Sequence, residues 1–132
     1  SIIYLASVAV KDYQVTKLLH ERGFVDDQAA FAIYFLEPSD EEMLGWMVAC
    51  RSPTATMVFL ASLMKSIACA LPLTEDKRWG GEINKGIESY INYLPEEQNK
   101  KLLELIGAFK ICTGRFHDDL RAVLKDIFNQ LP

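Results

Sequence analysis

The side chains best suited to chemistry lie together near the end of the chain, in residues 115–121 (Arg-Phe-His-Asp-Asp-Leu-Arg). A histidine next to carboxylates can ligate a metal ion or exchange protons with a substrate. The metal sites of helical phosphohydrolases, however, need a further histidine and a distant aspartate in register, and His20 is the only other histidine. The set of ligands falls short, so we predict no metal site here.

A solvated helix start is the simpler interpretation of the same residues. Asp118 and Asp119 would occupy the first turn of a helix, where negative charge complements the helix dipole, and Arg121 would follow one turn later. Side chains on such a face can contact another protein. We therefore predict His117, Asp118 and Arg121 as partner-binding residues. The alternative is an enzyme or small-ligand binder with a pocket between helices that uses His117 and Asp118.

The other reactive residue types are His20 and three cysteines, Cys50, Cys69 and Cys112. His20 falls in the last turn of a predicted helix, where a cation suits the dipole, so we interpret it as a cap. No histidine lies near Cys50 or Cys69 in the sequence to serve as a base. Each cysteine sits in a helical apolar pattern, which predicts buried free thiols in a reducing compartment. We expect no catalytic residue and no cofactor.

Two tryptophans are further candidates for contact with a partner. Trp79 lies in residues 78–81 (Arg-Trp-Gly-Gly), whose glycines have neither phosphate-loop nor dinucleotide-binding spacing. As a structural residue, Trp79 would cover the core where two helices bend apart. As functional residues, Trp46 and Trp79 would be exposed to a partner, and we include both among the predicted partner-binding residues.

Length and charge restrict the classes of function. A chain of 132 residues is long enough for one domain with its own core, so we predict a single helical domain over residues 1–132. The net charge is -4 and the pI about 5.2, without a block of basic residues, which argues against a nucleic-acid binder. The first residues lack the basic start of a signal peptide, and we expect a cytoplasmic protein.

The elements that would position these residues are organised around residues 53–71. Ser52 is a good N-cap, Pro53 is favoured at the first helical position, and Pro72 closes the other end. The helix between them is apolar on most of its circumference, which is typical of a bundle interior or a membrane span. A lysine within it, Lys65, makes a span costly, so we predict the central helix of a bundle. Its polar strip should reach solvent or a groove edge, and comprises Ser62, Lys65 and Ser66.

Proline and glycine divide the rest of the chain into further helices. We predict helical segments over residues 2–22 (continuous, or broken near Lys11-Asp12), 27–36 and 40–51. Further helices should open at Thr74, with an interruption or bend at Gly80-Gly81, after Pro95, and over residues 116–131. Ser39 and Glu42 have the spacing of a capping box. The fold class that follows is all-α, a compact bundle of six to seven helices around the central apolar helix.

Two resemblances accompany this pattern. The Trp79-Gly80 pair at a helix start resembles the motif of Bcl-2-like death regulators, and residues 19–23 echo their upstream motif. Residues 18–50, with Asp27, Pro38 and Trp46 in order, and residues 88–101, with Pro95, are similar to a family of uncharacterised bacterial all-helical proteins. That second resemblance implies a bacterial cytoplasmic accessory or adaptor protein, with some relatives associated with secretion machinery. It carries over no catalytic residue.

We therefore expect a small cytoplasmic adaptor that works by binding another protein through an amphipathic helix or an acidic surface. An acidic immunity-type inhibitor of a basic toxin is a variant of this hypothesis and predicts salt-sensitive binding. A Bcl-2-like helical regulator is a further alternative. Homodimerisation through the C-terminal helix, whose apolar residues recur at helical spacing, is a third expectation for the partner.

Overall fold

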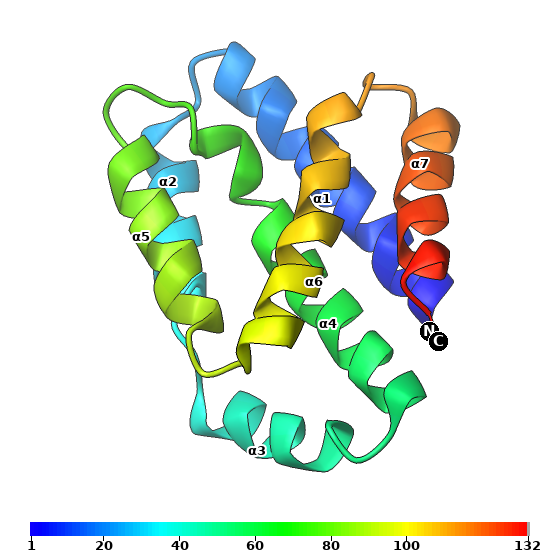
Figure 1. Cartoon of the computed structure of the whole chain (residues 1–132). Helices are drawn as coiled ribbons and strands as arrows, with labels where there is room; N and C mark the ends of the chain where they lie inside the picture. Colours follow the sequence, from blue (N-terminus) through cyan, green and yellow to red (C-terminus); the bar gives the residue numbers. More distant parts are fainter. Residues whose placement is uncertain (132) are drawn as a thin grey trace.

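The computed structural model describes residues 1–131 and is all-α, without a strand in that part of the chain (Figure 1). The prediction of a compact helical bundle is confirmed. The helices are α1 (Ile2–Glu21), α2 (Asp26–Phe35), α3 (Asp40–Ala49), α4 (Pro53–Ala68), α5 (Gly80–Ile91), α6 (Glu96–Gly107) and α7 (Phe116–Asn129), with short 3-10 helices η1 (Leu71–Leu73) and η2 (Ala108–Ile111). Helices α1 and α7, the first and the last of the chain, pack against each other (Figure 1).

The central helix is α4, as the sequence predicts. It packs against α1, α3 and α6, and its side chains from Leu60 to Ala68 supply much of the core. Ser52 caps it by accepting a hydrogen bond from the Ala55 amide at 3.4 Å. The helix ends at Ala68, before the predicted residue 71, and the chain turns there into η1. Its polar strip reaches solvent and a groove edge as expected, because Ser62 is exposed and Lys65 and Ser66 are half-buried.

Helix α1 is continuous through Lys11 and Asp12, where a break was one expectation. It ends in a Schellman turn at Gly23, which has a positive φ of 86° that glycine adopts without strain. The Phe24 amide donates to the Leu19 carbonyl at 2.9 Å, and the Gly23 amide donates to the His20 carbonyl at 3.1 Å. This turn reverses the chain and brings α2 back alongside α1.

The helix predicted to open at Thr74 does not form. Residues 74–79 make a turn instead, in which Asp76 Oδ1 accepts hydrogen bonds from the amides of Arg78 and Trp79, both at 2.9 Å. An aspartate that binds the amides after it competes with helix formation, which explains the error. Helix α5 begins at Gly80, so the Gly80-Gly81 pair starts a helix rather than bending one. No helix in residues 1–131 has the length and apolar character needed to cross a membrane.

Candidate protein-binding groove

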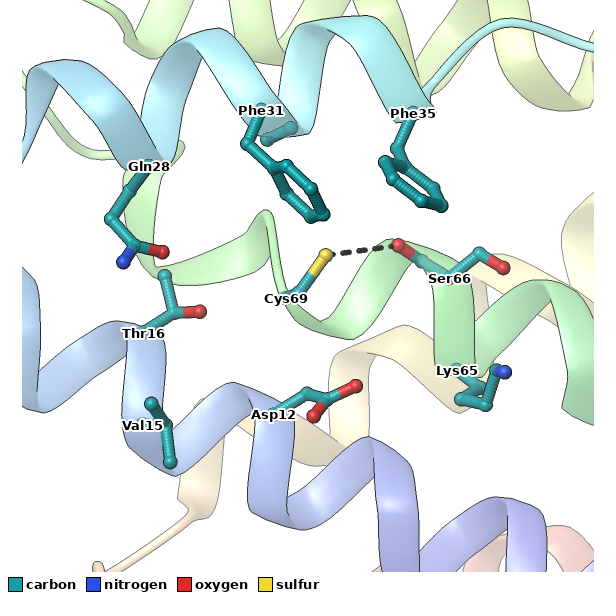
Figure 2. A pocket seen from close by; sticks show the side chains of 10 residues that line it. Asp12, Val15, Thr16, Gln28, Phe31, Phe35, Lys65, Ser66 and Cys69 are labelled. Atoms are coloured by element: carbon teal, nitrogen blue, oxygen red, sulfur yellow. Dashed lines mark hydrogen bonds between the residues drawn. The ribbon is translucent and has the colours of Figure 1, made fainter.

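A groove of about 430 Å³ lies between α1, α2 and the C-terminal end of α4 (Figure 2). Helix α1 forms one wall, α2 the opposite wall, and the end of α4 the floor. The lining residues are Asp12, Val15, Thr16, Gln28, Phe31, Ala32, Phe35, Lys65, Ser66 and Cys69. Figure 2 shows Phe31 and Phe35 extending from α2 toward Cys69 and Ser66 on the floor. The two phenylalanines and Val15 give the groove a large apolar surface, and polar side chains such as Asp12 and Lys65 line the rest of it.

The aromatic wall exists because α2 is apolar on more than one side. Its buried side packs against the core through Ala29 and Ala32, which are small and let α2 approach α5 closely. The side facing the groove keeps Phe31 57 % exposed and Phe35 51 % exposed, with their ring centroids 4.6 Å apart. Tyr34 continues this surface. Contiguous exposed aromatic side chains of this kind mark a site of interaction.

The polar groups of the groove come from α1 and α4. Burial raises the pKa of Asp12, and the positive charge of Lys65 across the groove partly opposes this rise. Thr16 is buried and faces the groove (Figure 2). Cys69 Sγ donates a hydrogen bond to the Ser66 carbonyl oxygen at 3.3 Å. Burial also raises the pKa of Cys69, so the floor carries a neutral thiol and not the thiolate that a nucleophile requires.

Acidic residues flank the aromatic wall along the chain, and two of them have partners: Asp26 pairs with Arg78, and Glu42 accepts a hydrogen bond from Tyr90. Residues 24–50, which hold α2 and α3, contain six of the 18 acidic residues and no lysine, arginine or histidine. Asp27 is one helical turn before Phe31 on the exposed side, and Glu37 follows the end of α2. All of these acids except Glu42 are exposed. The groove thus combines apolar contact area with a field that attracts cations.

Trp46 and Trp79 lie outside the groove. Trp46 is half-buried, with its ring centroid 5.6 Å from that of Phe59. Trp79 is half-buried as well, and its indole Nε1 donates a hydrogen bond to Asp26 Oδ1 at 2.9 Å. The Arg78 guanidinium lies 5.4 Å from the Trp79 ring centroid and also donates to Asp26. Trp79 therefore joins the start of α5 to the start of α2, as a structural residue would.

The residues predicted on the last helix divide between surface and core. His117, Asp118 and Arg121 are exposed on α7, and Asp118 pairs with Arg115 at 3.0 Å. Asp119 is different: it is only 1 % exposed. The prediction that both aspartates are solvated is wrong for Asp119, because its carboxylate accepts hydrogen bonds from the loop before α7.

Asp119 holds that loop together through four hydrogen bonds. It accepts from the Thr113 amide and hydroxyl at 2.6 and 3.0 Å, the Gly114 amide at 2.9 Å and Gln14 Nε2 at 2.7 Å. Burial alone would raise the pKa of Asp119, but these hydrogen bonds outweigh it and hold the pKa below its ordinary value. The sequence indicates that Asp119 lies in the first turn of a helix, but no spacing in it indicates the distant donor Gln14.

The cysteines and His20 also depart in part from their predictions. The cysteines are free, but Cys50 is exposed and Cys69 and Cys112 are half-buried, so the prediction of buried thiols is wrong for Cys50. His20 is more than a helix cap, because its Nε2 donates to Asp76 Oδ2 at 3.0 Å. This bond is the main cause that lowers the pKa of Asp76. Its two residues are 56 positions apart, and no sequence pattern connects them.

Residues 1–131 contain no cluster of three or more His, Cys, Asp or Glu side chains that could hold a metal ion. A second cavity of about 410 Å³ lies between α1, η1 and η2, with Tyr13, Leu71 and Phe109 in its lining, and neither His117 nor Asp118 takes part in it. His117 lines a shallow depression on the surface of α7 instead, and Asp118 is not among the residues that line it. No known protein family, curated protein or solved structure matches this chain.

Proposed function

We propose that this protein is an adaptor that binds another protein by taking a cationic amphipathic helix into the groove between α1 and α2. The observation that carries the proposal is the pair of exposed phenylalanines, Phe31 and Phe35, set in a stretch with six acidic and no basic residues. Helices bind grooves of this kind through apolar side chains at i, i+3, i+4 and i+7.

The residues that line and flank the groove supply the contacts that such a helix needs. Its apolar walls, Val15 on one side and Phe31 and Phe35 on the other, would receive the apolar stripe of the partner. Asp27 and Glu37 lie near opposite ends of α2, where lysines or arginines flanking that stripe would meet them. Charges of this type increase the association rate and make it depend on salt, whereas the buried aromatic contacts supply most of the affinity.

The proposal includes the narrower possibilities that the sequence raises. An inhibitor of a cationic toxin would use the same acidic surface, and the absence of basic residues from 24–50 favours it over a neutral-partner adaptor. A cytoplasmic accessory role in a bacterium, which the family resemblance implies, also fits a protein whose cysteines are free thiols.

A designed peptide provides the test. An idealised Leu/Lys amphipathic helix about five turns long should bind in isothermal titration calorimetry, and its Leu/Glu counterpart should not. The affinity of the Phe31→Ala/Phe35→Ala variant for the Leu/Lys peptide should be at least about tenfold lower than that of the native protein. Added salt should lower the affinity of the native protein as well. The matched control is Leu103→Ala, since Leu103 is exposed on α6 and does not line the groove. Equal binding by the phenylalanine variant and the native protein would show that the peptide binds elsewhere.

A charge-reversal variant separates the acidic groove from general attraction. Asp27→Lys/Glu37→Lys alters two exposed charges near the groove, whereas Glu88→Lys/Glu104→Lys makes the same change in net charge on α5 and α6. The first variant should lose more affinity for the Leu/Lys peptide than the second. Equal losses would assign the binding to net charge alone and contradict a site at the groove.

A further inference from the structure

The outer side of α7 has the properties that the groove requires of a partner. Leu120, Leu124 and Phe128 form an apolar stripe at helical spacing. His117, Arg121 and Lys125 flank it and are exposed. These six residues, which we call the α7 stripe, line a shallow depression on the surface of the molecule. The α7 stripe is thus a cationic amphipathic helix face carried by the same chain.

The α7 stripe is only partly used within its own molecule: Leu120 and Leu124 are half-buried against the core, whereas Phe128 is 49 % exposed. Helix α7 packs on α1 and η2 through its inner side, where Val123 and Ile127 are fully buried. The acids of α7 do not neutralise the stripe. Asp119 is buried in its loop, Asp118 pairs with Arg115, and Asp126 is half-buried near Glu104 of α6, where burial raises its pKa. The stripe therefore keeps the charges of Arg121 and Lys125 and the ring of Phe128 at the surface, together with the outer parts of Leu120 and Leu124.

We propose that the α7 stripe of one molecule docks in the groove between α1 and α2 of a second copy. The inference rests on the proposed function of the groove and names its occupant. Arg121 and Lys125 would meet the acidic stretch 24–50, and Phe128 and Leu124 would pack against Phe31 and Phe35. Helices α2 and α7 lie on opposite sides of the molecule (Figure 1), so a chain cannot fill its own groove with its own α7.

The contact is head to tail, which determines the form of the assembly. A groove on one side and a stripe on the other give a heterologous interface, and such interfaces form rings or open chains, not closed two-fold dimers. A single helix in a groove is a small interface, so we expect reversible association at high micromolar protein concentration. Salt should weaken it, because the pairing charges are exposed. A protein partner with a better helix would displace the second copy.

Two variants, each defective on one side, test this arrangement by sedimentation velocity. Arg121→Glu/Lys125→Glu removes the stripe and keeps the groove, and Phe31→Ala/Phe35→Ala does the reverse. All four side chains are exposed, and circular dichroism checks that the fold is intact. The native protein should show a weight-average mass that rises with concentration beyond a dimer. Each variant alone should stay monomeric, while their mixture should form a one-to-one dimer and nothing larger. Leu103→Ala should associate like the native protein.

Other outcomes would overturn the proposal. These are a native protein that stays monomeric at high micromolar concentration, a stripe variant that still associates, or a mixture of the two variants that stays monomeric. The Leu/Lys peptide distinguishes this failure from failure of the proposed function, since the stripe variant retains its groove. If that variant binds the peptide while no self-association occurs, the groove accepts a foreign helix only. If it binds no peptide, the groove itself is not a binding site.

Discussion

At the scale of single residues, the acidic side chains divide into those that build the fold and those that charge the surface. Asp119, Asp76 and Asp26 accept hydrogen bonds from groups distant in sequence, such as Gln14, His20 and Trp79. Glu42 Oε1 accepts from the hydroxyl of Tyr90 at 2.7 Å, so its side chain joins α3 to α5 instead of completing the capping box with Ser39. The Glu42 amide does donate to Ser39 Oγ at 3.1 Å, so half of the predicted box is present.

Replacement of Asp119 by asparagine should destabilise the protein in a pH-dependent manner. Asparagine offers one acceptor oxygen to four donors, which should cost about 1–3 kcal/mol at neutral pH. The folded pKa of Asp119 is lowered, so its stabilisation is present above the unfolded value of about 3.9 and is lost as pH falls through the folded value. Urea denaturation should therefore show a large difference between native and Asp119→Asn proteins at pH 6 that shrinks as the pH falls below 4.

The neighbouring residue provides the control for this measurement. Asp118→Asn removes an exposed charge paired with Arg115 and should change the free energy of unfolding by less than about 0.5 kcal/mol. A pH-independent difference for Asp119→Asn would contradict the assignment of a charged carboxylate to this site.

At the scale of elements, the two glycines at the start of α5 have different roles although they are adjacent. A Cβ on Gly80 would collide with the carbonyl oxygen of Thr74, whereas a Cβ on Gly81 would meet open space. Gly80 is buried under the turn of residues 74–79, and its amide donates to the Asp76 carbonyl at 2.8 Å. The close approach of backbone to backbone is what positions Trp79 against Asp26.

Alanine substitutions should separate these two roles. Gly80→Ala should lower the free energy of unfolding by about 1–3 kcal/mol or more, because the atom it meets is backbone and cannot rotate away. Gly81→Ala should be neutral or stabilising by up to about 1 kcal/mol, since alanine favours the helix and loses less chain entropy. Thermal melts of both variants provide the measurement. A Gly80→Ala protein as stable as Gly81→Ala would show that the turn can shift without cost.

At the scale of the whole molecule, the core is concentrated around α4, which packs most extensively on α1, and α2 and α3 are attached more loosely. Helix α4 contributes eight buried residues, whereas α2 contributes two and α3 one. The α2–α3 segment is also the part that carries the aromatic wall and the acidic charge. Binding surfaces often lie in the less stable parts of a fold, because side chains that are exposed for contact with a partner are not buried in the core.

Hydrogen exchange should reveal this division. Amides of α2 and α3 should exchange through local opening, faster than those of α1 and α4, which open only when the whole protein unfolds. Mass spectrometry of the native protein should thus show early labelling in residues 26–49 and late labelling in residues 53–68. Addition of the Leu/Lys peptide should slow exchange in α2 and leave α6 unchanged. Protection of α3 equal to that of α4 would contradict the loose attachment.

Local patterns in the sequence determined the helical class, the central helix and most helix ends. Ser52-Pro53, Ser39 and Gly23 act through hydrogen bonds and dihedral angles within a few residues, so their effects can be predicted without the fold. The helix start at Gly80 was missed because it depends on a turn that folds back on Thr74. The apolar residues of α2 are nearly continuous, so their spacing did not indicate which side of the helix the core would cover.

The tertiary structure alone decided which of the candidate residues share a surface. The chemistry of residues 115–121 predicted a solvated cluster, but Asp119 turned inward because Gln14 of α1 and the loop at Thr113 lie beside it. The groove joins Asp12, Phe31 and Lys65 from three helices, and no spacing along the chain relates them. Contacts between distant segments depend on how helices pack, and packing is a property of the whole set of side chains. For this reason His117, Asp118 and Arg121 could be predicted as partner-binding residues from their types alone, whereas the groove became visible only in the folded molecule.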